Sequence, residues 1–202
     1  MQNILETVIN YFVIVTVINI IMNGLPIPKI SKDVRKRTFF VQSPNRFEYQ
    51  KNRECAGYAT AYVLRHLGIE MDGLTAYHSI PIKLLHGNVS GLGIFYLCMK
   101  NKVRVKLCIG NVNALKNTLT AGNPLIVLTQ SVVGSNSLHY INVVGYDESN
   151  IYTVDSIESH KNVENDFYNR IIPIEDFKKI WNTSMIYQPL FFHLFFEISK
   201  KQ

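Results

Sequence analysis

The chain of 202 residues and 23.2 kDa is 47% hydrophobic and 18% charged, which indicates one globular domain with room for an appendage and excludes a disordered tail or a small disulfide scaffold. The net charge of +6 falls entirely within residues 29–53, which hold eight basic and two acidic side chains, so the remainder is neutral. The pI near 9.2 could suggest a nucleic-acid partner, but a nucleic-acid-binding domain would carry its basic residues on one face of the fold. Here they are concentrated beside the apolar N-terminal segment, so no such partner is predicted.

The chain starts with an apolar segment. Residues 7–22 (TVINYFVIVTVINIIM) contain only two Thr and two Asn among apolar side chains, and this run needs its flanks to reach the ~20 residues of a spanning helix. Because a basic n-region and an A-x-A cleavage site are missing, an uncleaved membrane anchor over residues 1–28 is favoured over a cleaved signal peptide. A buried amphipathic or core helix is the alternative, since Asn10 and Asn19 are polar.

The basic residues follow this segment directly, and residues 29–45 are predicted to form a basic linker. Positive charge beside a membrane helix favours the cytoplasmic side, so the positive-inside rule predicts a cytoplasmic location for the rest of the chain. Such a stretch can contact anionic lipid head groups, and a solvated linker is the alternative.

Residues 46–202 are predicted to form a single domain with helices and strands. Helices come early and several strands come late, without the alternation of a doubly wound sheet, so the predicted fold class is α+β. Apolar periodicity predicts helices at 55–67, 91–100, 113–121 and 174–182, and strands at 103–109, 125–128, 139–146 and 151–157.

The three cysteines, Cys55, Cys98 and Cys108, have neither CxxC nor Cys/His ligand spacing. No disulfide framework, metal site or cofactor is therefore predicted. Cys55 opens the strongest predicted helix, and the positive end of a helix stabilises a thiolate nucleophile. A buried, inert cysteine is the alternative interpretation.

A thiolate nucleophile needs a general base and a group that orients this base. His139 opens a predicted strand, and Asp155 lies in the next one, where a carboxylate among apolar residues requires a partner. A four-residue turn at 147–150 would put the two side chains on opposite faces of the hairpin. We therefore predict one more loop residue, or a β-bulge, which puts His139 and Asp155 on the same face.

Acyl transfer also needs hydrogen-bond donors for the developing oxyanion. The backbone N–H of Cys55 is one candidate, and the side-chain amide of Gln50 is the second. A polar loop residue without a catalytic role is the alternative for Gln50.

These residues resemble a known family. The signals are Gln50, ECAGYATA from Glu54, LHYINVVGYD from Leu138 and IYTVDS from Ile151. Together they are similar to the papain-like cysteine peptidases of the bacteriocin-leader-processing type, cysteine peptidase family 39. The resemblance covers about residues 46–156, including the strand GNPLIVL before His139.

The resemblance implies a papain-like fold, in which a helix bearing the Cys packs on an antiparallel sheet, and a cysteine peptidase that acts on a peptide or protein. It implies that Cys55 is the nucleophile, His139 the general base, Asp155 its orienting partner and Gln50 the oxyanion donor. The chain departs from the family where Gln50 precedes Cys55 by five residues rather than six, and where Ala56 takes the place of a Gly.

Several alternatives stay open. The same residues could serve a transglutaminase-like acyl transferase, although the separation of Cys55 and His139 is long for that class. A papain-like domain that binds peptides or leader sequences without cutting them is the non-enzymatic alternative. Nothing in the sequence predicts an oligomeric state.

Overall fold

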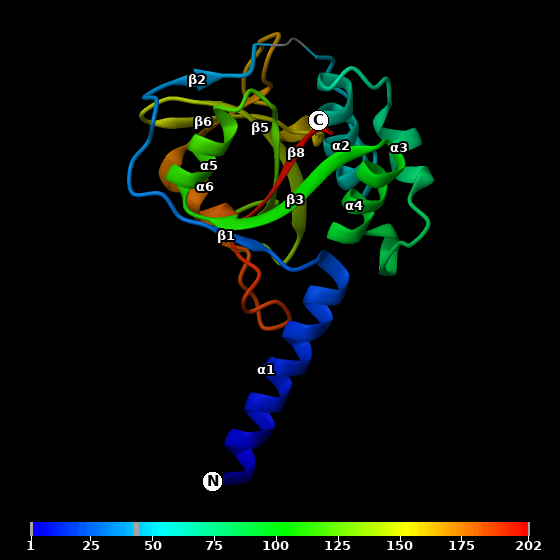
Figure 1. Ribbon diagram of the computed structural model, residues 1–202, viewed down its shortest axis with the longest axis vertical. Coiled ribbons are helices and arrows are strands. Elements are labelled where there is room, and N and C mark those ends of the chain that lie inside the picture. The colour runs from blue at the N-terminus through cyan, green and yellow to red at the C-terminus, as the bar shows by residue number, and fades with distance from the viewer. Residues whose placement is uncertain (1, 43–44, 202) are drawn as a thin grey trace.

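A long N-terminal helix projects from a body in which helices flank one strongly twisted sheet (Figure 1). The computed structural model describes residues 2–42 and 45–201, so residues 43 and 44 of the predicted linker and the two terminal residues of the chain lie outside it. The helices are α1 (Gln2–Asn23), α2 (Cys55–His66), α3 (Gly73–Ser79), α4 (Gly91–Lys100), α5 (Val112–Leu119) and α6 (Ile174–Trp181), with 3-10 turns η1 (Leu85–Gly87) and η2 (Glu158–His160).

Eight strands of the described residues form the sheet. Its order is β1-β3-β8-β4-β5-β6-β7, with β2 added along β5, and the only parallel pair among these strands is β1 with β3. The strands are β1 (Ile27–Lys29), β2 (Phe39–Phe40), β3 (Val103–Gly110), β4 (Leu125–Gln130), β5 (Leu138–Tyr146), β6 (Asn150–Val154), β7 (Arg170–Pro173) and β8 (Leu194–Lys200). The predicted α+β class with an apolar N-terminal helix is confirmed.

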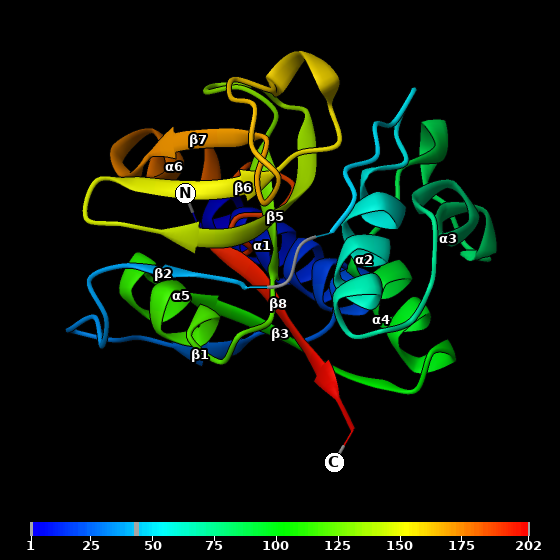
Figure 2. The same cartoon turned by 90° about the horizontal axis from the view of Figure 1, so that it is seen from above.

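Side chains alternate between two cores along the central strands, as the period of two in a strand requires. Phe196 of β8 packs with α2 and α4 in one core, and Phe195 packs with α5 and α6 in the other. Figure 2 shows α2 and α4 grouped on one side of the molecule and α5 and α6 on the other. The sheet is therefore buried on both faces.

Some elements differ from those expected from the sequence. The aromatic tail was not expected to be a strand, yet β8 lies at the centre of the sheet between β3 and β4. The residues of the predicted basic linker supply strand β2 and part of β1, which pair with β5 and β3. Strands of two or three residues are too short for apolar alternation to predict them from the local sequence. They form because a sheet edge offers unpaired N–H and C=O groups.

Helix α2 is held tightly against its neighbours, which fixes the position of its first residue. Asn142 of β5 donates from Nδ2 to the carbonyl of Ala59 over 3.0 Å. A Cβ built at Gly57 would lie 2.6 Å from the backbone N of Tyr77 and 2.7 Å from the carbonyl of Gly73, so only glycine permits this approach of α3. Cys55 therefore starts a helix that has little freedom to move.

Candidate active site

The structure brings Cys55, His139 and Asp155 together. Cys55 is the first residue of α2 and is half-buried, while His139 lies at the start of β5 and Asp155 directly follows β6. His139 Nε2 lies 2.7 Å from Asp155 Oδ1, and both side chains are fully enclosed. The Cys55 side chain is close enough to the imidazole to raise the pKa of His139. Since Nε2 faces Asp155, Nδ1 is the ring nitrogen left for the thiol.

A β-bulge makes the meeting of His139 and Asp155 possible. Next to the turn, Tyr146 opposes Ile151, but the register shifts between Val143 and Gly145, and farther along Val143 opposes Thr153. The sequence analysis predicted such a shift by one residue, through an extra loop residue or a β-bulge, and the bulge confirms it. At Gly145 a Cβ would lie 2.4 Å from the ring of a Phe on the neighbouring strand β2, so the bulge coincides with a close approach of another strand.

The charges of the pair stabilise one another. Burial by itself would lower the pKa of His139, but the Asp155 carboxylate and the Cys55 side chain outweigh burial and raise it to about 9. Burial would likewise raise the pKa of Asp155, but His139, His160 and the Ile157 backbone N–H hold it well below its usual range. At neutral pH the pair is therefore an imidazolium next to a carboxylate.

Four donor groups surround the Asp155 carboxylate. Oδ1 is 2.7 Å from His139 Nε2 and accepts from the Ile157 N–H over 2.9 Å. Oδ2 accepts from Arg170 Nη1 over 2.7 Å and lies 2.9 Å from His160 Nδ1. Because charge-assisted hydrogen bonds act on both oxygens, the carboxylate cannot turn away from the imidazole.

The backbone of Asp155 is held as well. Asn169, which is fully buried, accepts from the Asp155 N–H through Oδ1 and donates from Nδ2 to the Asp155 carbonyl, both over 2.8 Å. Sequence reasoning missed Asn169, Arg170 and His160. The one available signal was that an Asp in an apolar strand needs a partner. Arg170 opens β7 and Asn169 directly precedes it, and neither this strand nor the 3-10 turn that holds His160 was predicted.

Gln50 lies in the loop before α2, beside the residue that follows Asp155. Its backbone N–H donates to the Ser156 carbonyl over 2.8 Å, and the Ser156 hydroxyl donates to Gln50 Oε1 over 2.6 Å. The side-chain Nε2 donates to the Asn52 carbonyl over 2.5 Å, which leaves its second hydrogen for another acceptor. The oxyanion role of Gln50 stays a prediction.

The other two cysteines have different surroundings. Cys98 and Cys108 are fully buried, and burial raises the pKa of Cys98 to about 12 and also raises that of Cys108. Both thiols therefore stay protonated and enclosed, whereas Cys55 borders an open cleft. Of the three, only Cys55 is placed to react with a substrate.

One group among the described residues has the donor set for a metal ion. Ligand atoms of His139, Asp155 and His160 lie within 4.8 Å of one another. The Arg170 guanidinium already neutralises the same carboxylate, and a cation would have to displace it. These residues suit a network that orients His139 better than a metal centre, and the absence of a metal or cofactor stays a prediction.

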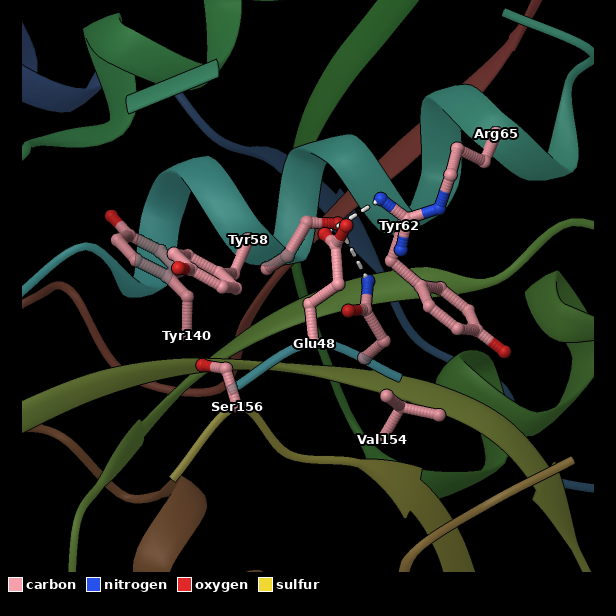
Figure 3. A pocket seen from close by; sticks show the side chains of 9 residues that line it. Glu48, Tyr58, Tyr62, Arg65, Tyr140, Val154 and Ser156 are labelled. Atoms are coloured by element: carbon pink, nitrogen blue, oxygen red, sulfur yellow. Dashed lines mark hydrogen bonds and ion pairs between the residues drawn. The ribbon is translucent and has the colours of Figure 1, made fainter. Parts of the chain in front are cut away.

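A cleft of about 560 Å³ adjoins Cys55. It passes between the last turns of α1, the segments at 84–90 and 136–138, and the loop at 187–188. A second hollow lies along α2, where Figure 3 shows Glu48 bound to Arg65, and Tyr58, Tyr62 and Tyr140 also line it. That hollow holds about 10 Å³, room for one water at most, so the cleft at Cys55 is the candidate substrate site.

Comparisons with known proteins show what this chain is similar to. Residues 38–187 match the model of the Peptidase_C39 like family. A C39-like peptidase from Bacillus anthracis is similar in structure, with a TM-score of 0.59, 17% identity, and 80% of this chain and 98% of that chain covered. Among curated protein sequences, none matches this chain.

Two other solved structures are similar to this chain. One is the peptidase domain of Streptococcus ComA, a bifunctional ABC transporter of a quorum-sensing pathway, with a TM-score of 0.59, 15% identity, and 79% of this chain and 100% of that chain covered. The other is a double glycine motif protease from an AMS/PCAT transporter in complex with the leader peptide, with a TM-score of 0.57, 13% identity, and 82% and 100% covered. At these identities the likeness establishes the fold.

Proposed function

Because this chain belongs to the Peptidase_C39 like family, we propose that it is a cysteine peptidase that hydrolyses peptide bonds through Cys55, His139 and Asp155. The observation that supports the proposal most strongly is the contact of His139 with both Asp155 and Cys55 at the edge of an open cleft. Cys98 and Cys108 have no comparable surroundings.

In the proposed reaction, the Cys55 thiolate attacks the carbonyl carbon of the substrate, and a C–S bond forms as the carbonyl oxygen takes up the negative charge. The backbone N–H of Cys55 and the Gln50 amide donate to this oxyanion. The His139 imidazolium then gives its proton to the departing nitrogen, the C–N bond breaks, and a thioester remains on Cys55.

Neutral His139 next removes a proton from water, and the resulting hydroxide attacks the thioester. The C–S bond breaks, the carboxylic acid product leaves, and Cys55 returns as a thiolate beside the imidazolium. Asp155 keeps the imidazole ring in one orientation and stabilises its positive charge in both steps. The raised pKa of His139 supports this role, because the proton is in place before the substrate arrives.

The proposed substrate is a polypeptide, and the complex of a related protease with a leader peptide supports this class. We further propose that residues 1–28 anchor the chain in a membrane, that 29–45 form a basic linker and that 46–202 form the peptidase domain. Within the described residues one helix, Ile4–Asn23, is long and apolar enough to cross a membrane, and only 6% of its most apolar stretch is buried. The basic residues after the helix support a cytoplasmic catalytic domain.

The first experiment is alkylation of the full chain with iodoacetamide at neutral pH. We expect fast labelling of wild type and of Cys98→Ala, and loss of fast labelling in Cys55→Ala, because the other thiols are buried and protonated. Labelling of Cys98 or Cys108 at the rate of Cys55 would show that the site is assigned to the wrong cysteine.

The second experiment is digestion of a peptide library by wild type and by Cys55→Ala. Cleavage that depends on Cys55 supports the peptidase, and acyl transfer to an added amine without hydrolysis would favour a transglutaminase-like reaction. Binding of peptides without any cleavage would favour the non-enzymatic domain.

A further inference from the structure

The helix proposed as the membrane anchor forms part of the candidate substrate cleft. Ile18, Asn19, Met22 and Asn23, all in the last two turns of α1, line the same 560 Å³ cleft as Cys55. A helix that served only as a tether would not need to reach the nucleophile. The structure instead makes its C-terminal end one wall of the site.

Polar contacts hold this wall in place. Asn19, 9% exposed, donates from Nδ2 to the Tyr187 carbonyl over 2.7 Å. Asn23 Oδ1 accepts from the N–H of Gly91, the first residue of α4, over 2.9 Å, and thereby takes the capping role that the side chain of Ser90 does not fill. The end of α1 is therefore fixed to the catalytic domain at two points beside the cleft.

The loop 184–190 follows α1 toward the N-terminus. The Tyr11 hydroxyl donates to the Ile186 carbonyl over 3.4 Å, and Tyr11 lies about 18 Å below Asn23 along the helix, at 1.5 Å per residue. Figure 1 shows the orange segment that contains this loop beside α1. The loop has no Asp, Glu, Lys or Arg, and the side chains of Ile186, Tyr187 and Leu190 are 77%, 48% and 56% exposed.

A bilayer core is about 30 Å thick, and α1 at 22 residues is about 33 Å long. If α1 crosses the membrane, the uncharged loop 184–190, which reaches Tyr11 about 18 Å below Asn23, enters the lipid beside the helix. The cleft at Ile18–Asn23 then opens near the level where the helix leaves the lipid. Apart from Arg53, the cleft is lined by apolar and uncharged polar side chains. An uncharged, apolar peptide suits these walls, because a charged one would lose its hydration without a partner.

We propose that the cleft takes an uncharged, apolar stretch of a membrane-inserted polypeptide and that Cys55 cuts it within a few residues of the bilayer surface. This inference rests on the proposed peptidase function and on α1 as a membrane anchor, and it adds the substrate class. The wall formed by α1 aligns the substrate beside the anchor helix, where the substrate itself emerges from the lipid.

The main test uses proteoliposomes that contain the full chain and a substrate with one transmembrane segment. In one substrate, a sequence that the library digest shows to be cut begins about 4 residues after the transmembrane segment. In a second substrate, a flexible Gly/Ser spacer of about 20 residues, which spans about 25 Å, separates the same sequence from that segment. We expect at least tenfold faster cleavage at the short spacing. Equal rates, or faster cleavage with the long spacer, would overturn the inference.

The same cleavable sequence as a free peptide distinguishes the two proposals. If the free peptide is cut but the short-spaced membrane substrate is not, the peptidase stands and the membrane-surface inference fails. If the library digest yields no sequence whose cleavage depends on Cys55, the proposed function itself fails.

A second test does not depend on catalysis. In vesicles with brominated lipids, we expect the fluorescence of Tyr187→Trp to be quenched relative to wild type, whose Trp181 is fully buried. Met99→Trp is the matched control, because Met99 is 65% exposed at the far end of α4, and it should not gain quenching. Equal quenching of the two variants would overturn the predicted orientation.

Discussion

The contact between His139 and Asp155 predicts a specific change in pH dependence for Asp155→Asn. This substitution keeps the shape and the oxygen that faces Nε2 but removes the negative charge. Asp155 supplies the main effects that raise the pKa of His139 to about 9, and burial opposes them. Without the charge, we expect this pKa to fall to 6.5 or lower, a change of at least 2.5 units or about 3 kcal/mol.

The protonation state of the His139 imidazole determines how activity depends on pH. The imidazolium protonates the leaving nitrogen, so activity should decline as pH rises through the pKa of His139. Wild type should keep its activity up to about pH 9. Asp155→Asn should be about tenfold less active than wild type at pH 7.5 and about a hundredfold less active at pH 8.5 from this effect alone.

The assay is kcat/KM for a cleavable peptide between pH 5 and 10, with thermal melting to establish that each variant is folded. Asp166→Asn is the matched control, because Asp166 is exposed in the loop between β6 and β7, and its profile should coincide with that of wild type. If the activity of a folded Asp155→Asn still declines only near pH 9, Asp155 is not the source of the raised pKa of His139.

Three further predictions concern stability, each measured by urea unfolding. Arg170→Met leaves the enclosed Asp155 carboxylate without its guanidinium and should lower the free energy of unfolding by about 3–5 kcal/mol. Arg104→Met, at an exposed site, should lower it by under ~1 kcal/mol, and equal losses would contradict the role of Arg170 at Asp155. Gly57→Ala should cost about 1–3 kcal/mol, because the new Cβ would lie 2.6 Å from the backbone of α3, and an unchanged midpoint would disprove this close approach. The raised pKa of His139 contributes stability that is complete below pH 6.5 and is lost as pH rises through about 9. Wild type should therefore lose more stability than Asp155→Asn between pH 6 and 9.5, and parallel losses would count against the pair.

Local sequence patterns were sufficient to predict the elements that carry the proposed catalytic residues. The periodicity of residues 55–67 predicted a helix that begins at Cys55, and α2 begins there. Counting across the hairpin predicted that His139 and Asp155 can meet only with an odd loop or a bulge, and the structure has the bulge. These predictions succeeded because helix periodicity and strand alternation depend on neighbours in the chain.

The partners of Asp155 depended on tertiary structure. Asn169 and Arg170 approach it because β7 pairs with β6, and β7 has too few residues for its alternation to be distinguished from a loop. Strand β8 was missed for a related reason, since its place between β3 and β4 depends on pairing with segments far away in the sequence.

The N-terminal segment shows the same division. Composition alone determined that residues 7–22 form an apolar helix, and the sequence also showed that the basic charge follows it. Asn19 is a polar residue within that apolar helix, and only the folded domain provides the Tyr187 carbonyl to which it donates and the Gly91 N–H from which Asn23 accepts. Helices and strands with a strong local period could thus be predicted from neighbouring residues in the chain. Which polar groups meet depends on the folded domain, because a hydrogen bond between distant residues forms only where folding brings the two groups together.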